Sequence, residues 1–189
     1  MGKKILVVVD VQNDFVTGSL GSKDAQAAIP KIVERISRAD YDALYFTRDT
    51  HYDNYLETNE GKKLPVKHCI LNTWGWNICD EVMAAANKVQ VSHPYILQHI
   101  IDKPTFGSEI MANDIWQYLA IATETSDQSE VELLGFCTDI CVVSNALLVK
   151  AAVFERAEVT VNSECCAGVT PELHEAALNV MKSCQINII

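Results

Sequence analysis

The sequence predicts an α/β protein in which a doubly wound sheet of about six mainly parallel strands lies between two layers of helices. Short runs of apolar, β-rich residues recur along the chain with little polar alternation, which is typical of strands buried on both faces. Segments with apolar residues at helical spacing separate these runs. Such an alternation of strand and helix indicates a three-layer fold with a largely parallel sheet.

The strands are expected at the apolar runs, which are residues 5–9, 43–47, 96–101, 131–136, 159–161 and 186–189. Helices are expected between them, at residues 24–39, 77–86, 108–122, 142–154 and 171–183. The first helix has one apolar face, formed at helical spacing by Ala28, Ile29, Ile32, Val33 and Ile36. The last helix has the clearest start, because Thr170 can cap free backbone N–H groups and Pro171 suits the first helical position.

Length and composition indicate one soluble domain spanning residues 1–189. The chain has 49% hydrophobic residues, enough to form a core, but its apolar stretches are too short to span a membrane. The N-terminus runs into charge where a cleavable signal would stay apolar, and seven cysteines without such a signal favour reduced thiols in the cytoplasm. The net charge of -10 and the lack of a dense Lys/Arg cluster argue against nucleic-acid binding.

Four side chains that can take part in catalysis or bind a ligand follow apolar runs: Asp10, Asp49, Lys103 and Cys141. Ligands of doubly wound sheets bind beyond the carboxyl ends of the strands, so we expect these side chains to converge there. Residues 49–76 have little periodicity and many polar and aromatic side chains. A long loop of this kind inside a compact domain is usually functional.

Cys141 opens an apolar segment that fits a helix, and a helix start together with a nearby cation lowers a thiol pKa. These residues predict a thiolate nucleophile at Cys141, with Asp10 to accept a proton and Lys103 to favour the thiolate. Backbone N–H groups around residues 137–141 would supply an oxyanion hole. Each residue also has a structural alternative: a small buried cysteine, a loop-capping aspartate and a surface lysine.

Four motifs resemble the isochorismatase-like cysteine hydrolase superfamily, and within it the nicotinamidases: VVVDVQNDF at 7–15, TRDTH at 47–51, KPTFGS at 103–108 and GFCTDICV at 135–142. The resemblance implies that Asp10, Lys103 and Cys141 form the catalytic set. It also implies a cis peptide between Phe136 and Cys137, which would aim the Cys137 N–H, beside that of Cys141, at the developing oxyanion. Phe15 would form a wall of the substrate pocket, and the family usually forms homo-oligomers.

Nicotinamidases also hold a divalent metal, and the resemblance implies that Asp49, His51 and His68 are three of its ligands here. The chain departs from the family where a further His is expected, and Glu60 is the best substitute, with Glu57 second. Mixed His and carboxylate ligands suit zinc, manganese or iron without choosing among them. No organic cofactor is implied. The structural alternative is that Asp49 and His51 fix the loop by hydrogen bonds and His68 is a buried ring.

The leading hypothesis is that a small carboxamide is hydrolysed to its acid and ammonia through a Cys141 thioester. Nicotinamide, giving nicotinic acid, is the best single candidate for this small-molecule partner. Two alternatives stay open: another hydrolysis known in the superfamily, of a ureido or carbamoyl compound or of isochorismate, and a non-catalytic redox or ligand-binding role. Isochorismatases dispense with the nucleophilic cysteine, so Cys141 weighs against that branch.

Overall fold

The computed structural model, which describes residues 2–122 and 128–189, contains a six-stranded sheet in which every neighbouring pair is parallel. The strand order is β3-β2-β1-β4-β5-β6. The strands are β1 (Lys4–Val9), β2 (Ala43–Asp49), β3 (Leu97–Lys103), β4 (Ser129–Phe136), β5 (Ala157–Ala167) and β6 (Asn187–Ile188). All six overlap the apolar runs of the sequence, so the predicted sheet is confirmed.

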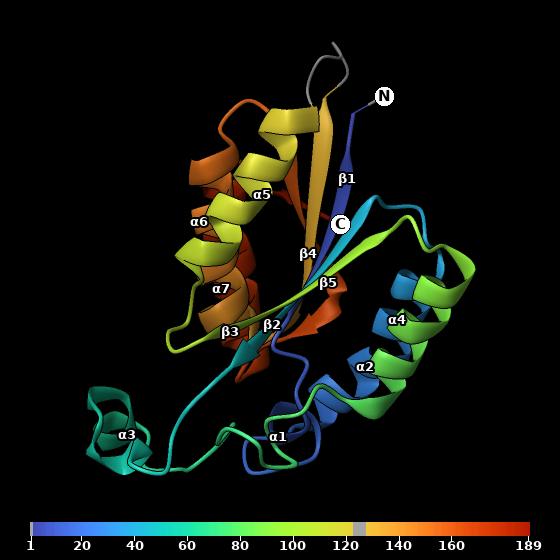
Figure 1. Cartoon of the computed structure of the whole chain (residues 1–189). Coiled ribbons are helices and arrows are strands. Elements are labelled where there is room, and N and C mark those ends of the chain that lie inside the picture. Colours follow the sequence, from blue (N-terminus) through green and yellow to red (C-terminus); the bar gives the residue numbers. More distant parts are fainter. Residues whose placement is uncertain (1, 123–127) are drawn as a thin grey trace.

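Helices cover both faces of the sheet, as predicted (Figure 1). On one face α2 (Lys23–Ser37) packs against α4 (Asp80–Ser92). On the other lie α5 (Glu109–Ala122), α6 (Val143–Val153) and α7 (Pro171–Ser183). Thr170 caps α7 as expected, because its hydroxyl accepts a hydrogen bond from the Leu173 N–H at 3.2 Å. None of the helices in the described ranges is long and apolar enough to cross a bilayer.

Some boundaries differ from the sequence-based expectation. The helix expected at residues 77–86 begins only at Asp80, because the preceding residues pair with the segment after β1 through an isolated bridge between Gln12 and Ile78. β5 is longer than expected, since it continues to Ala167. Three short helical segments had no periodic signal in the sequence: α1 (Asn13–Val16), the 3-10 turn η1 (Tyr55–Glu57) and α3 (Asn59–Lys63).

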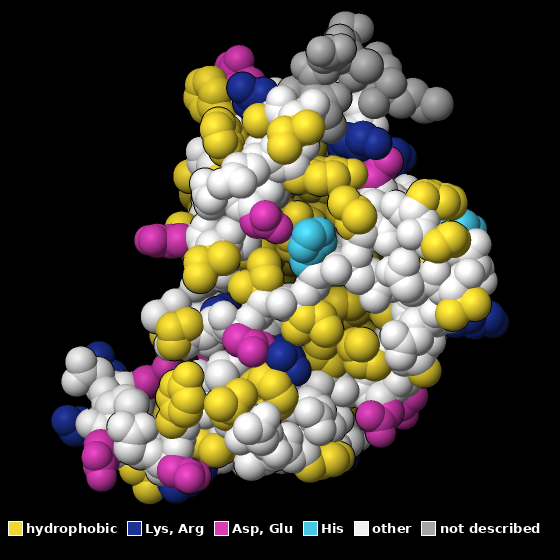
Figure 2. All heavy atoms as spheres, viewed as in Figure 1, with side chains coloured by type: hydrophobic (Ala, Val, Ile, Leu, Met, Phe, Trp, Pro, Cys, Tyr) yellow, Lys and Arg dark blue, Asp and Glu magenta, His cyan; other side chains and the backbone are white. Residues whose placement is uncertain are grey.

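The central strands form the core, whereas β3 is an edge strand. From Ile5 to Val9 no residue of β1 is more than 2% exposed. Leu97 and Ile100 on β3 are 46% and 47% exposed. Figure 2 shows hydrophobic side chains on this face of the molecule, between the two layers of helices. The sheet therefore buries its centre and leaves one edge partly open.

The strand order reverses its direction between β1 and β4, which creates a crevice at the carboxyl ends of these two strands. Asp10 directly follows β1, and the turn that carries Cys141 directly follows β4. The two strands approach closely here: Gly135 has a φ of 123°, and a side chain on it would collide with the Val9 carbonyl oxygen. The fold thus brings the two segments together at its topological switch point.

Candidate active site

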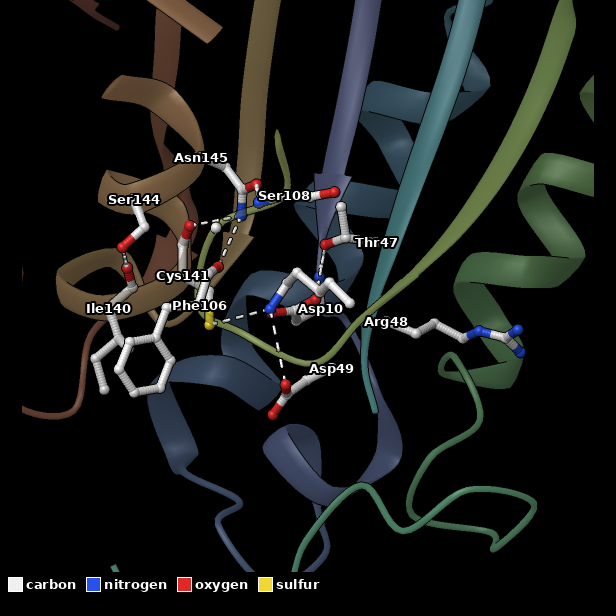
Figure 3. Close-up of polar contacts among 12 residues, drawn as sticks. Asp10, Thr47, Arg48, Asp49, Phe106, Ser108, Ile140, Cys141, Ser144 and Asn145 are labelled. Atoms are coloured by element: carbon white, nitrogen blue, oxygen red, sulfur yellow. Dashed lines mark hydrogen bonds and ion pairs between the residues drawn. The ribbon is translucent and has the colours of Figure 1, made fainter. Parts of the chain in front are cut away.

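The ammonium group of Lys103 lies at the centre of a buried cluster at this end of the sheet. Its Nζ is 2.6 Å from Oδ2 of Asp10, 3.5 Å from Sγ of Cys141 and 3.8 Å from Oδ1 of Asp49. Figure 3 shows that Asp10, Asp49 and Cys141 reach this point from separate segments of the chain. None of the four residues is more than 4% exposed. The structure therefore brings together all four residues that follow apolar runs in the sequence.

Strand ends position Asp10 and Lys103, two of the three charged members of the cluster. Asp10 is the first residue beyond β1 and has a φ of 49°, in the left-handed region that Asp tolerates better than most residues. Its Oδ1 accepts a hydrogen bond from the Thr47 hydroxyl at 2.7 Å. Lys103 is the last residue of β3, and its Nζ also donates to the carbonyl of Thr105 at 3.1 Å. Both side chains are held by neighbours as well as by one another.

Cys141 lies in a wide π-helical turn, Thr138–Val142, which connects β4 to α6. The Cys137 carbonyl accepts hydrogen bonds from the Ile140 and Val142 N–H groups, at 3.1 and 3.0 Å. Cys141 is therefore inside this turn, and the regular helix begins two residues later at Val143 rather than at residue 142 as expected. The peptide bond between Phe136 and Cys137 is cis, as the family resemblance implied.

Asn145 is a buried residue that sequence reasoning missed. Its Nδ2 donates to the carbonyls of Cys141 and Phe106, at 2.8 and 3.1 Å, and its Oδ1 accepts from the Ser108 N–H at 2.9 Å (Figure 3). These bonds join the turn that carries the nucleophile to the loop that follows Lys103. An Asn within a helical segment gives no sign of this function until the loop that it binds is placed beside it.

The electrostatics of the cluster act on the Cys141 thiol in opposing directions. Burial raises the pKa of the Cys141 thiol well above its usual value, and the charge of Asp10 raises it further, whereas Lys103 lowers it. The burial of Cys141 therefore opposes the thiolate that the sequence predicts, whereas the charge of Lys103 favours it. Burial also raises the pKa of Asp10, against the opposing charge of Lys103. With Asp10 made more basic in this way, the Cys141 thiol can give its proton to Asp10 as the sulfur attacks a substrate.

Asp49, His51, Glu60 and His68 form a second cluster, in which one potential ligand atom from each residue lies within 4.8 Å of all the others. Oδ2 of Asp49 is 3.0 Å from Nε2 of His51 and 3.4 Å from Nε2 of His68. Oε1 of Glu60 is 3.5 and 3.8 Å from the same two nitrogens. Atoms about 2.1 Å from one ion, at octahedral to tetrahedral angles, lie about 3.0 to 3.4 Å apart. The two Asp49 distances fall in this range and the two Glu60 distances are slightly longer, so a small movement of the Glu60 side chain would let the four residues hold a single divalent ion.

The two imidazoles present the right atoms to such an ion. Nδ1 of His68 donates to the carbonyl of Val66 at 2.8 Å, which leaves the lone pair of a neutral ring on Nε2. Nε2 of His51 is buried and has no hydrogen-bond partner among the residues that the structure describes, although Asp49 is close. Burial lowers the pKa of His51, but the carboxylates of Asp49 and Glu60 outweigh it and raise that pKa to about 9. The cluster therefore attracts positive charge.

The sequence left two candidates for the fourth position in this cluster. Glu60, on α3, joins the other three residues. Glu57 is exposed and lies outside the cluster. The structure thus favours the first candidate.

A cavity of about 390 Å³ connects the two clusters. Cys141 lines it together with Asp49, Glu60 and His68. Phe15 lines it, where the family resemblance placed a pocket wall, and so does Cys137. Most of the remaining wall is apolar, including Phe106, Phe136 and Ile140. A small, partly apolar molecule in this cavity would contact the thiol and the candidate metal ligands at the same time.

Comparisons with known proteins identify the family of this chain. The nicotinamidase of Saccharomyces cerevisiae is 28% identical over 179 residues, which cover 76% of this chain and 80% of the relative. The crystal structure of a pyrazinamidase/nicotinamidase from Streptococcus mutans matches with a TM-score of 0.77 and 26% identity over 98% of this chain and 99% of the other. The pyrazinamidase of Pyrococcus horikoshii, solved in complex with zinc, matches with a TM-score of 0.70 and 25% identity, covering 99% and 98% of the two chains. The isochorismatase domain model matches residues 4–189, and the chain therefore belongs to the isochorismatase family.

Proposed function

We propose that this protein is a cysteine-dependent amidase that hydrolyses nicotinamide to nicotinic acid and ammonia. The observation that carries the proposal is the contact of Lys103 with both Asp10 and Cys141, beside a cavity that the metal ligands share. Its nicotinamidase relatives favour this substrate over a ureido compound, a carbamoyl compound or isochorismate. A redox role is less well supported, because a buried thiol of raised pKa is a poor target for oxidants.

Cys141, Asp10 and Lys103 carry out the acylation half of the proposed mechanism. Sγ of Cys141 attacks the amide carbon while the thiol proton passes to Asp10, and the carbonyl oxygen becomes an oxyanion. The N–H groups of Cys137 and Cys141 receive this oxyanion, and the Lys103 ammonium stabilises the negative charge that develops in the cluster. The C–N bond then breaks, the nitrogen takes the proton from Asp10, and ammonia leaves a thioester on Cys141.

Deacylation uses the same groups in the same order. Water attacks the thioester carbon and gives a proton to Asp10, so that a second tetrahedral intermediate forms at the same oxyanion site. The C–S bond breaks, nicotinic acid leaves, and the sulfur takes the proton back from Asp10. Each turnover therefore consumes one water and returns the Cys141 thiol and the Asp10 carboxylate to their starting states.

Asp49, His51, Glu60 and His68 would hold a divalent ion, for which zinc is the first candidate because a relative was solved in complex with it. When bound, such an ion supplies a Lewis acid for a lone pair such as that of a pyridine nitrogen. The apolar wall, including Phe15, would then pack against the ring. These contacts would orient the carboxamide toward Cys141.

Purified protein is expected to release ammonia and nicotinic acid from nicotinamide in equal amounts. Removal of the metal with a chelator should lower this rate by about tenfold or more, and added zinc should restore it. An ammonia assay with product chromatography measures both. If no member of a panel of small amides releases ammonia, the enzymatic proposal fails; activity that survives chelation would contradict only the role of the metal.

The Glu60→Gln variant is expected to bind zinc about tenfold or more weakly than the unchanged protein, because it loses a charged ligand. Glu57→Gln is the matched control, since it makes the same chemical change nearby on an exposed residue outside the cluster. Competition with a chromogenic chelator measures the affinity. Equal affinities of the two variants would remove Glu60 from the ligand set.

Three broader expectations remain predictions. We infer that residues 1–189 act as one domain, because one sheet takes strands from both ends of the chain. A homo-oligomer and a cytoplasmic location follow from the family resemblance and from the sequence. Light scattering on the purified protein would test the homo-oligomer.

A further inference from the structure

The side chain of Gln12 binds both the backbone N–H and the backbone carbonyl of Asp49. Its Oε1 accepts a hydrogen bond from the Asp49 N–H at 2.7 Å, and its Nε2 donates to the Asp49 carbonyl at 2.9 Å. The second proton of Nε2 goes to the carbonyl of Trp76 at 2.8 Å. Gln12 is 0% exposed, so these three bonds form without competition from water.

The path of the chain explains why Asp49 needs this partner. β1 pairs with β2 only as far as Val9, opposite Thr47, and the chain then turns away at Asp10. Asp49 lies two residues further along β2, where the ladder with β1 has ended. The Gln12 amide takes the place of the missing strand. On its other side Asp49 remains paired with Lys103 of β3.

Asp49 is the residue that joins the two halves of the site. Its Oδ2 faces the two imidazole nitrogens of the metal cluster, at 3.0 and 3.4 Å. Its Oδ1 lies 3.8 Å from the Lys103 ammonium. A small rotation or shift of the Asp49 backbone would therefore change the metal cluster and the surroundings of Lys103 together.

We propose that Gln12 is a positioning residue that sets the orientation of Asp49, and that it thereby controls the affinity of the site for its metal. The inference rests on the proposed metal role of Asp49. Residues that hold a metal ligand in place commonly change affinity about 10- to 100-fold when mutated. Gln12 contacts neither the cavity nor the proposed ion directly, because the contacts of its amide are with backbone groups.

Gln12→Met tests the inference, because Met has a similar length but cannot form the three hydrogen bonds. Gln98→Met is the matched control: the amide of Gln98 also donates to a backbone carbonyl, that of Ala86 at 2.8 Å, but at the opposite end of β3 from Lys103. Gln12→Asn is a milder variant that keeps the amide but shortens its reach. Zinc affinity is measured on metal-free protein by chelator competition, with thermal unfolding recorded in parallel.

The expected result is that zinc affinity falls about tenfold or more in Gln12→Met and by a smaller factor in Gln12→Asn, but stays unchanged in Gln98→Met. Equal zinc affinities for all three folded variants would overturn the inference even if their stabilities differed. Since this measurement needs no substrate, failure to hydrolyse nicotinamide would not affect it. An unchanged protein that binds no zinc would overturn the metal site itself, and the inference with it.

Discussion

Replacing Cys141 with Ala is expected to lower kcat for nicotinamide hydrolysis by about 10⁴- to 10⁶-fold. Alanine cannot form the thioester, and the oxyanion-binding N–H groups that remain do not supply a nucleophile. The Asp10 and Lys103 ion pair, at 2.6 Å, does not depend on the sulfur, so the variant should still fold. The ammonia assay measures the loss, and circular dichroism confirms the fold.

Cys184→Ala is the control for this variant, because it removes an exposed thiol at the end of α7 and should leave kcat unchanged. The mass of the intact protein, quenched during turnover, gives a second measurement. The unchanged protein should carry an acyl group, and Cys141→Ala should not. Activity of Cys141→Ala within tenfold of the unchanged protein would rule out the thioester mechanism.

Lys103→Met is expected to lower the free energy of unfolding by about 3–5 kcal/mol and to abolish activity. Lys103 is 1% exposed and is the cation beside two buried carboxylates, Asp10 and Asp49. Without it these carboxylates would be left uncompensated in the interior, and their mutual repulsion would oppose folding. Urea unfolding measures the change in stability, and the ammonia assay measures the change in rate.

Two comparisons make this prediction specific to the buried pair. Lys3→Met breaks an ion pair of 2.8 Å with Asp42, but those side chains are 35% and 36% exposed, so it should cost about 1 kcal/mol or less. Combining Lys103→Met with Asp10→Asn should cost less than the sum of the single changes, because the second removes one of the stranded charges. Equal costs for Lys103→Met and Lys3→Met would show that the buried ion pairs of Lys103 stabilise the protein no more than an exposed pair does.

The elements of the fold could be predicted because buried strands and amphipathic helices leave periodic patterns in the chain. Short elements such as α1 and α3 left none, since four or five residues are too few to repeat a pattern. The start of α4 was also misplaced, because the bridge between Gln12 and Ile78 is a contact between distant segments. Such a contact cannot be predicted from the residues on either side of the helix start.

The candidate site could be predicted in part for a similar reason. Asp10, Lys103 and Cys141 follow apolar runs, and parallel strands end at a common edge of the sheet. The contributions of Thr47 and Asn145 were missed, because each depends on a hydrogen bond to a distant residue. Thr47 bonds to Asp10, and Asn145 bonds to Phe106 in a loop that has no regular sequence pattern. Residues of this kind are identified by their partners, and partners are known only once the chain has folded.

The sequence by itself determined the succession of strands and helices along the chain and the reactive residues that follow the strands. It also determined the motifs that relate the chain to its family. Only the tertiary structure decided the burial of Cys141, the choice of Glu60 over Glu57 and the contact of Gln12 with Asp49. The physical reason is the range of the interactions. Periodicity and propensity act between near neighbours, whereas burial, charge pairing and ligand geometry depend on residues that only the folded chain brings within a few ångströms.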